Sequence, residues 1–177
     1  MLVCAWCTKT LDPRDPSQLS HGMCEDCRTF FSDRAEPTAL ADFIGQFAFP
    51  VLVLDSNGVA VEANESAQEF VRKSPFEILG KLKGEILECA HARLPKGCGR
   101  TIHCEACTIR SSVMETHLSG RPMADVDAYQ DLETPEGTRR VPLKISTVRH
   151  GDCIVLKIVP VSQAIPLPVP AGTARKR

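Results

Sequence analysis

The chain has 177 residues, of which 43% are hydrophobic, and its formal net charge is −1. This length allows one medium-sized domain with a small attachment, and the composition is sufficient to bury a core. A net charge near zero gives no electrostatic reason to expect a nucleic-acid or membrane partner. The longest apolar stretch, Phe47 to Leu54, is far too short to span a bilayer.

Cysteine is the unusual component, with nine residues. The first residues, MLVCAWC, meet a cysteine before any apolar leader can form, so we expect a cytoplasmic protein. In a reducing compartment, this many cysteines indicates ligands or reactive thiols rather than disulfides. Eight of them fall into two groups of four. We expect the remaining one, Cys153, to be a small apolar residue of a strand and not a ligand.

The first group consists of two CxxC pairs separated by sixteen residues, a spacing typical of a four-cysteine zinc site. Its members are Cys4, Cys7, Cys24 and Cys27. Only Leu11, Leu19 and Met23 are apolar between the pairs, too few for a core. We therefore predict a zinc-ribbon-like module over residues 1–36 that binds zinc independently of the rest, with the metal supplying about 10 to 16 kcal/mol of folding free energy.

Two other functions of this module are less consistent with its sequence. Residues 1–36 contain four Lys or Arg against six Asp or Glu, a balance that would repel nucleic-acid phosphates. A thiol–disulfide motif is expected between a strand and a helix, whereas Cys4 has almost no chain before it. Structural zinc is the favoured interpretation.

Residues 37–47 form a short linker whose apolar residues recur at three- and four-residue steps, which predicts an amphipathic helix. These residues are Leu40, Phe43, Ile44 and Phe47. Such a face needs a partner, either the following domain or a second copy of the chain.

The next stretch, PVLVLDSNGVAVEAN, has two apolar runs around an Asn-Gly turn and predicts a β-hairpin. A helix is expected from Glu65 to Arg72.

The second cysteine group lies in the stretch CAHARLPKGCGRTIHCEAC and comprises Cys89, Cys98, Cys104 and Cys107. The last two are separated by two residues, a gap that lets neighbouring thiolates reach one ion or cluster. We interpret the group as one four-thiolate site that holds an iron–sulfur cluster or zinc. His91 and His103 either form hydrogen bonds to its sulfurs or face water.

The remainder predicts a helix from Thr108 to Leu118 and three strands. If the helix begins slightly earlier, Cys104 and Cys107 lie one turn apart. The strand-like runs cover 124–129, 141–147 and 153–159, and the proline-rich residues 162–177 predict a disordered tail. The fold class is therefore α+β: a five-stranded antiparallel sheet over residues 48–161, its helices grouped in one connection, preceded by the zinc ribbon.

Residues 48–161 resemble a PAS domain, the sensory fold of bacterial kinases and regulators, through the hairpin DSNGVAVEAN and Asn64 at its junction with the first helix. The segments CAWC and SHGMCEDC resemble a small zinc-binding segment at the N-terminus of bacterial signalling proteins. The PAS resemblance implies that the connection carrying the second cysteine group walls a ligand pocket, as in PAS sensors that hold an iron–sulfur cluster. It also implies a signalling partner, such as a histidine kinase or regulator, and is compatible with a homodimer.

We thus predict a signal-sensing protein that responds to redox state, oxygen or another gas. Two alternatives stay open: a PAS module with structural zinc sites that senses a small organic ligand, and an adaptor that binds partner proteins. The chain has no GxxxxGK[ST] loop, no GxSxG elbow and no kinase motif set, so we do not expect an enzyme. GEILECAHARL does not match the cysteine setting of flavin-linked light sensors, and a haem site at His117 is disfavoured.

Overall fold

The structure, a computed structural model, describes residues 2–4, 6–7, 9–12, 20–32, 37–134 and 137–161. The tail predicted over 162–177 lies outside the described residues, as do parts of the predicted ribbon.

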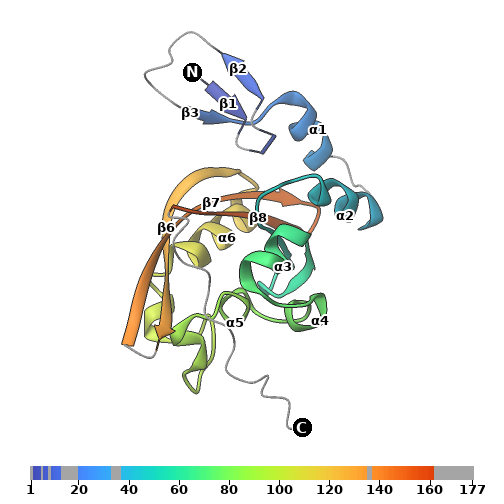
Figure 1. The fold of residues 1–177 in the computed structure, drawn as a ribbon. Coiled ribbons are helices and arrows are strands. Elements are labelled where there is room, and N and C mark those ends of the chain that lie inside the picture. Colours follow the sequence, from blue (N-terminus) through green and yellow to red (C-terminus); the bar gives the residue numbers. More distant parts are fainter. Residues whose placement is uncertain are drawn as a thin grey trace.

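A five-stranded antiparallel sheet forms the centre of the molecule (Figure 1), which confirms the predicted fold class. The spatial order of its strands is β5-β4-β8-β7-β6. The strands are β4 (Val51–Leu54), β5 (Ala60–Ala63), β6 (Met123–Thr134), β7 (Gly137–His150) and β8 (Cys153–Pro160). β4 and β5 form the predicted hairpin around the Asn-Gly turn, with Gly58 at a φ of +77°.

All the helices of this domain lie in the connection between β5 and β6. They are α3 (Glu65–Val71), α4 (Pro75–Ile78), α5 (Lys83–Ile86), the 3₁₀ turns η1 (Ala90–Arg93) and η2 (Ile102–Cys104), and α6 (Thr108–Ser119). They cover one face of the sheet, which we call the inner face. Alternate strand residues such as Leu52, Leu54 and Leu156 point to it and are completely buried.

The side chain of Asn64 forms hydrogen bonds that connect the first hairpin to the elements around it. Asn64 lies at the junction of this hairpin with the first helix of the domain, as predicted. Its side-chain oxygen accepts hydrogen bonds from the backbone N–H groups of Val51 and Ala67, so it caps α3. Its amide group donates to the carbonyl oxygens of Ile44, Phe47 and Phe49 at 2.9 to 3.1 Å.

β6 and β7 are longer than their apolar runs predicted, because they continue to Thr134 and back from Gly137 as a two-stranded extension beyond the end of β8. The added residues are mostly polar, with charged pairs such as Asp131 opposite Arg140 and with Leu132 as a buried apolar residue, so the apolar pattern did not reveal them. Pro142 lies where the pairing of β7 with β8 ends, which explains how an inner strand accommodates a proline.

The N-terminal module lies against the opposite, outer face of the sheet (Figure 1). It contains β1 (Leu2–Cys4), β2 (Thr10–Asp12), β3 (Ser20–Gly22) and α1 (Glu25–Ser32), and it is followed by α2 (Pro37–Gly45). Trp6, 1% exposed, shares a buried cluster with Phe31 of α1 and Ile44 of α2, and with Val53 and Val155 of the sheet. The linker helix therefore packs on the following domain. The expected self-contained ribbon is instead part of a shared core.

Within the described residues, no helix combines the length and the apolar character that crossing a membrane would require.

Candidate metal centres

The ribbon cysteines converge on one point. In the described part of the chain, they are the one group of three or more Cys, His, Asp or Glu residues whose ligand atoms all lie within 4.8 Å of one another. The members are Cys4, Cys7, Cys24 and Cys27. A tetrahedral zinc ion with Zn–S bonds of about 2.3 Å needs sulfurs about 3.8 Å apart. The arrangement therefore fits a single bound ion, as the spacing predicted.

The backbone of the ribbon supports sulfur as a ligand. The N–H group of Cys24 donates to Cys4 Sγ at 3.4 Å, and that of Cys27 donates to Cys24 Sγ at 3.4 Å. Burial opposes ionisation of Cys4, but backbone hydrogen bonds outweigh it and lower its pKa to about 7. Burial and the neighbouring thiols raise the pKa of Cys27 instead. A bound cation removes this conflict by stabilising all four thiolates together.

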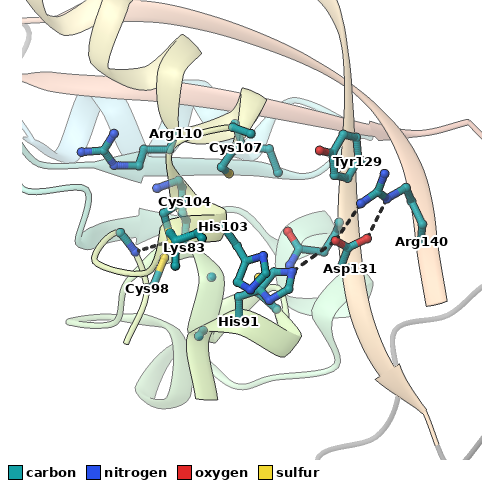
Figure 2. Close-up of a pocket in the computed structure, with 18 residues that line it drawn as sticks. Lys83, His91, Cys98, His103, Cys104, Cys107, Arg110, Tyr129, Asp131 and Arg140 are labelled. Atoms are coloured by element: carbon teal, nitrogen blue, oxygen red, sulfur yellow. Dashed lines mark hydrogen bonds and ion pairs between the residues drawn. The ribbon is translucent and has the colours of Figure 1, made fainter. Parts of the chain in front are cut away.

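A cavity of about 230 Å³ lies on the other side of the sheet, between its inner face and the connection that follows α5 (Figure 2). All four cysteines of the second group line it, together with the two histidines of the same stretch. These residues are Cys89, Cys98, Cys104, Cys107, His91 and His103. The structure thus gathers around one cavity the residues that the sequence predicted as one site.

The cysteine end of the cavity carries a cation and hydrogen-bond donors. Cys104 Sγ accepts from the N–H group of Gly99 at 3.1 Å and lies 3.2 Å from the hydroxyl of Thr101. Burial opposes ionisation of Cys104, but these hydrogen bonds and the ammonium of Lys83 lower its pKa. Burial raises the pKa of Cys98, and the positive charge of Lys83 opposes this rise. Lys83 is only 7% exposed and has no carboxylate partner among the described residues.

A chain of stacked and paired side chains closes the other end (Figure 2). The rings of His91 and His103 stack with centroids 3.9 Å apart, and His91 Nε2 lies 3.3 Å from a carboxylate oxygen of Asp131. Arg140 donates to both oxygens of that carboxylate, at 2.8 and 3.0 Å, and lies over the ring of Tyr129. These hydrogen bonds lower the pKa of Asp131, so it is a stable anion on the cavity wall. His91 and His103 therefore contact the wall and each other.

The second cysteine group is more widely spread than the ribbon thiols, because no three of its ligand atoms meet the 4.8 Å distance in the described residues. Cys104 ends η2, whereas Cys107 precedes the first residue of α6. The two are therefore in separate elements and not one turn apart on a single helix. Cys89 is held near the sheet by a bridge to Leu132 of β6.

Sequence reasoning missed the polar and charged cavity residues outside the cysteine stretch, among them Lys83, Gln130 and Asp131. One signal was present, because Gln130 continues the alternation of inward residues after Ala128 and precedes Leu132, so a polar side chain stands at a core position. Lys83 had no local signal, since only the fold brings α5 to the cysteines.

Cys153, predicted not to be a ligand, is half-buried on the outer-face cluster, and burial raises its pKa.

Comparison with known protein families finds no family profile that matches the chain, and no curated protein matches it either. Among solved structures, the PAS domain of nitrogen regulation protein NR(II) from Vibrio parahaemolyticus is 14% identical with a TM-score of 0.47, covering 72% of this chain and 99% of that one. The PAS domain of Bordetella pertussis BvgS is 16% identical with a TM-score of 0.42, covering 72% and 86%.

A domain of the sensory box sensor histidine kinase/response regulator from Geobacter sulfurreducens is 13% identical with a TM-score of 0.44, covering 70% of this chain and 91% of that one. Each of these three TM-scores is below 0.5. We therefore transfer no ligand or partner from these proteins to this chain.

Proposed function

We propose that the chain is a cytoplasmic signalling protein in which a PAS sensor domain, residues 48–161, holds a cysteine-ligated iron–sulfur cluster, and in which the N-terminal ribbon holds structural zinc. Its signal would be redox state, oxygen or another gas. The element order supports the PAS assignment, since the helices lie in one connection within a five-stranded antiparallel sheet. The grouping of eight of the nine cysteines into two sets of four supports ligands in place of disulfides, as expected in a reducing compartment.

One observation carries the proposal: four cysteines from separate short segments line the same cavity between helix and sheet. Cores use free cysteines as small apolar residues, but such residues pack against their neighbours and do not surround an open volume. Thiols and imidazoles are the ligands of soft metal centres. Asp131, the one carboxylate on the wall, is occupied by Arg140 and His91.

The spread of these thiols favours a cluster over a single ion. A lone zinc ion brings all its thiolates to about 3.8 Å from one another, as the ribbon cysteines allow. In a cluster with four cysteine ligands, the thiolates are divided over two or four iron atoms, so they do not all lie close to one another. The wider group around the cavity suits that second arrangement.

The surrounding residues would control the charge and solvent access of the centre. A cluster held by Cys89, Cys98, Cys104 and Cys107 would supply one-electron redox chemistry and sensitivity to oxidation. Lys83 and Arg110 place positive charge at the wall, which balances an anionic centre. The N–H group of Gly99 and the hydroxyl of Thr101 lie within hydrogen-bond distance of Cys104 Sγ. The pair of His91 and Asp131 lies at the other end of the cavity, beside Arg140.

We propose that the output passes to a partner protein, such as a histidine kinase or regulator, with no enzymatic activity in the chain itself. The absence of recognised catalytic motifs in the sequence supports this division. Nucleic acid and membrane are not expected partners, because the net charge is −1. A homodimer is part of the same proposal.

The test is anaerobic purification of the full chain, followed by analysis of iron, acid-labile sulfide and zinc and by an absorption spectrum. We expect a brown protein with one zinc per chain and with iron and sulfide in equal amounts, whose colour bleaches in air. Serine variants at each cavity cysteine should lose iron and keep zinc. The positions are Cys89, Cys98, Cys104 and Cys107.

Cys153→Ser is the matched control and should retain both metals, because Cys153 lies on the outer face. A colourless protein with zinc at both sites, or a protein that carries an organic molecule and no second metal, would overturn the proposal. So would retention of iron after replacement of Cys89 and Cys98, because a two-cysteine site would then be sufficient.

A further inference from the structure

A buried amide donor without a partner faces the cavity. Gln130 of β6 is 5% exposed, and its Nε2 atom has no hydrogen-bond partner. In the described part of the chain, two other buried side-chain atoms share this condition, the Nδ1 atoms of His117 and His150, but neither residue lines the cavity. Gln130 is therefore the buried group whose missing partner a cavity guest would supply.

The alternation of side chains along β6 fixes the position of Gln130. Ala128 and Leu132, two residues before and after it, belong to the inner-face core and are 6% and 1% exposed. An apolar residue would be expected between them. An amide in this position loses its hydration on folding, and its free donor is unfavourable unless something accepts the hydrogen bond.

Two acceptors on the cavity wall already take part in hydrogen bonds of the protein. The carboxylate of Asp131 accepts from Arg140 and lies beside His91. Cys104 Sγ accepts from the N–H group of Gly99 and contacts the Thr101 hydroxyl. The remaining charged groups on the wall, Lys83 and Arg110 among them, are donors. A guest that carries hydrogen-bond acceptors and negative charge would match these donors and supply the missing partner.

We infer that Gln130 Nε2 donates a hydrogen bond to a sulfur of the bound centre, either an inorganic sulfide or a cysteine thiolate. This inference rests on the proposed function. Sulfur atoms of an iron–sulfur cluster gain negative charge on reduction, so an N–H donor stabilises the reduced state more than the oxidised one. Gln130 consequently raises the reduction potential. It also connects the centre to β6, whereas the cysteines come from the connection.

The test compares Gln130→Leu with the wild-type holoprotein, both purified anaerobically with the cluster in place. Leucine is similar in size and suits a position between Ala128 and Leu132. We expect the midpoint potential in a redox titration to move to a more negative value. We also expect the substitution to affect the apoprotein and the holoprotein in opposite ways. In the apoprotein it removes a buried donor that has no partner, whereas in the holoprotein it removes a hydrogen bond to the cluster. The melting temperature of the apoprotein should stay the same or rise, while the holoprotein should lose its cluster faster in air.

Gln68→Leu is the matched control, since the amide of Gln68 on α3 already donates to the Ala63 carbonyl and is away from the cavity. Its midpoint should equal that of the wild type. If the wild-type chain holds a cluster and Gln130→Leu leaves both its midpoint and its air stability unchanged, this inference is wrong and the proposed function stands. If the wild-type chain holds no cluster, both are wrong.

Discussion

The backbone at Gly84 lies directly against Cys98 of the second cysteine group. A Cβ atom added there would lie 2.6 Å from Cys98 Sγ and 3.1 Å from its Cβ. The backbone of Gly84 is helical, within α5, so the restriction comes from space and not from conformation. Because the cysteine side chain is short, it cannot move aside without moving the sulfur that would bind the metal.

We therefore predict that Gly84→Ala displaces Cys98 and weakens retention of the cluster on the order of tenfold, the scale seen when groups that position metal ligands are changed. Iron per chain after dialysis against a chelator measures the effect. Gly45→Ala in α2 is the control, because nothing lies within 4 Å of its added Cβ. Equal iron retention in the two variants would show that Cys98 is not a ligand.

Lys73 and Glu88 form a nearly buried ion pair just before Cys89, with side chains 8% and 11% exposed. Lys73 also donates to the carbonyl oxygens of Glu85 and Ile86, at the end of α5. Burial opposes ionisation of Glu88, but hydrogen bonds from Lys73 and Arg93 outweigh it and lower its pKa. Its ionised form therefore stabilises the folded chain.

We predict that Lys73→Met lowers the free energy of unfolding by about 3 kcal/mol near pH 7, because it leaves a buried carboxylate with one cation fewer. A carboxylate with a depressed pKa contributes stability above its ordinary pKa of about 4.3 and loses it as the pH falls through the lower folded value. The difference from the wild type should hence shrink below about pH 4.

Urea unfolding at several pH values measures this difference. Lys144→Met, which removes the exposed partner of Asp127, is the control and should cost less than about 1 kcal/mol at every pH. A pH-independent loss for Lys73→Met would mean that its packing, and not its charge, supports the α5 terminus.

At the scale of elements, the ribbon and α2 serve as the cover of the outer face of the sheet. Trp6 packs against Phe31 and Phe47, with ring centroids 5.0 and 6.3 Å apart. Val51, Val53 and Val155 of the sheet lie in the same cluster and are completely buried. A metal bound by the ribbon cysteines would thus organise a module whose apolar residues pack against the sheet and α2.

We predict that Cys7→Ser weakens zinc binding and increases amide exchange beyond the ribbon, in β4 and β8, because the outer-face valines lose their cover. Cys7 is the exposed member of the four cysteines, so its replacement leaves the packing of the core unchanged. Hydrogen exchange with mass spectrometry is the measurement, with Cys153→Ser as control. Increased exchange confined to residues 1–32 would mean that the ribbon folds independently, as its cysteine spacing first suggested.

In the whole molecule, the two cysteine groups lie on opposite faces of one sheet. The ribbon cysteines belong to the outer-face cluster, and the cavity opens on the inner face. Alternation along β4, β7 and β8 produces this division, since neighbouring residues of each strand point to opposite sides. His150 at the end of β7 stacks on Phe30 of α1, so the sheet touches the ribbon directly. The sheet therefore lies between the two cysteine groups and contacts the elements that carry both.

The sequence by itself determined what short-range chemistry dictates. Two CxxC pairs identified four cysteines that converge on one point, the Asn57-Gly58 turn identified the first hairpin, and three- and four-residue steps identified α2 and α6. Each of these signals depends on residues close together in the chain, where spacing alone fixes the geometry. The antiparallel sheet with one helical connection followed from the order of those elements.

Only the tertiary structure decided which distant residues meet. Lys83, Gln130 and Asp131 reach the cavity because α5 and the long β6 pack around the cysteine stretch, and no local pattern encodes those contacts. The extension of β6 and β7 was hidden because its residues are mostly polar, with cross-strand charged pairs such as Asp131 and Arg140, so it carries little apolar alternation. The ribbon's dependence on the sheet was hidden too, since Trp6 acquires a core only from residues on another part of the chain.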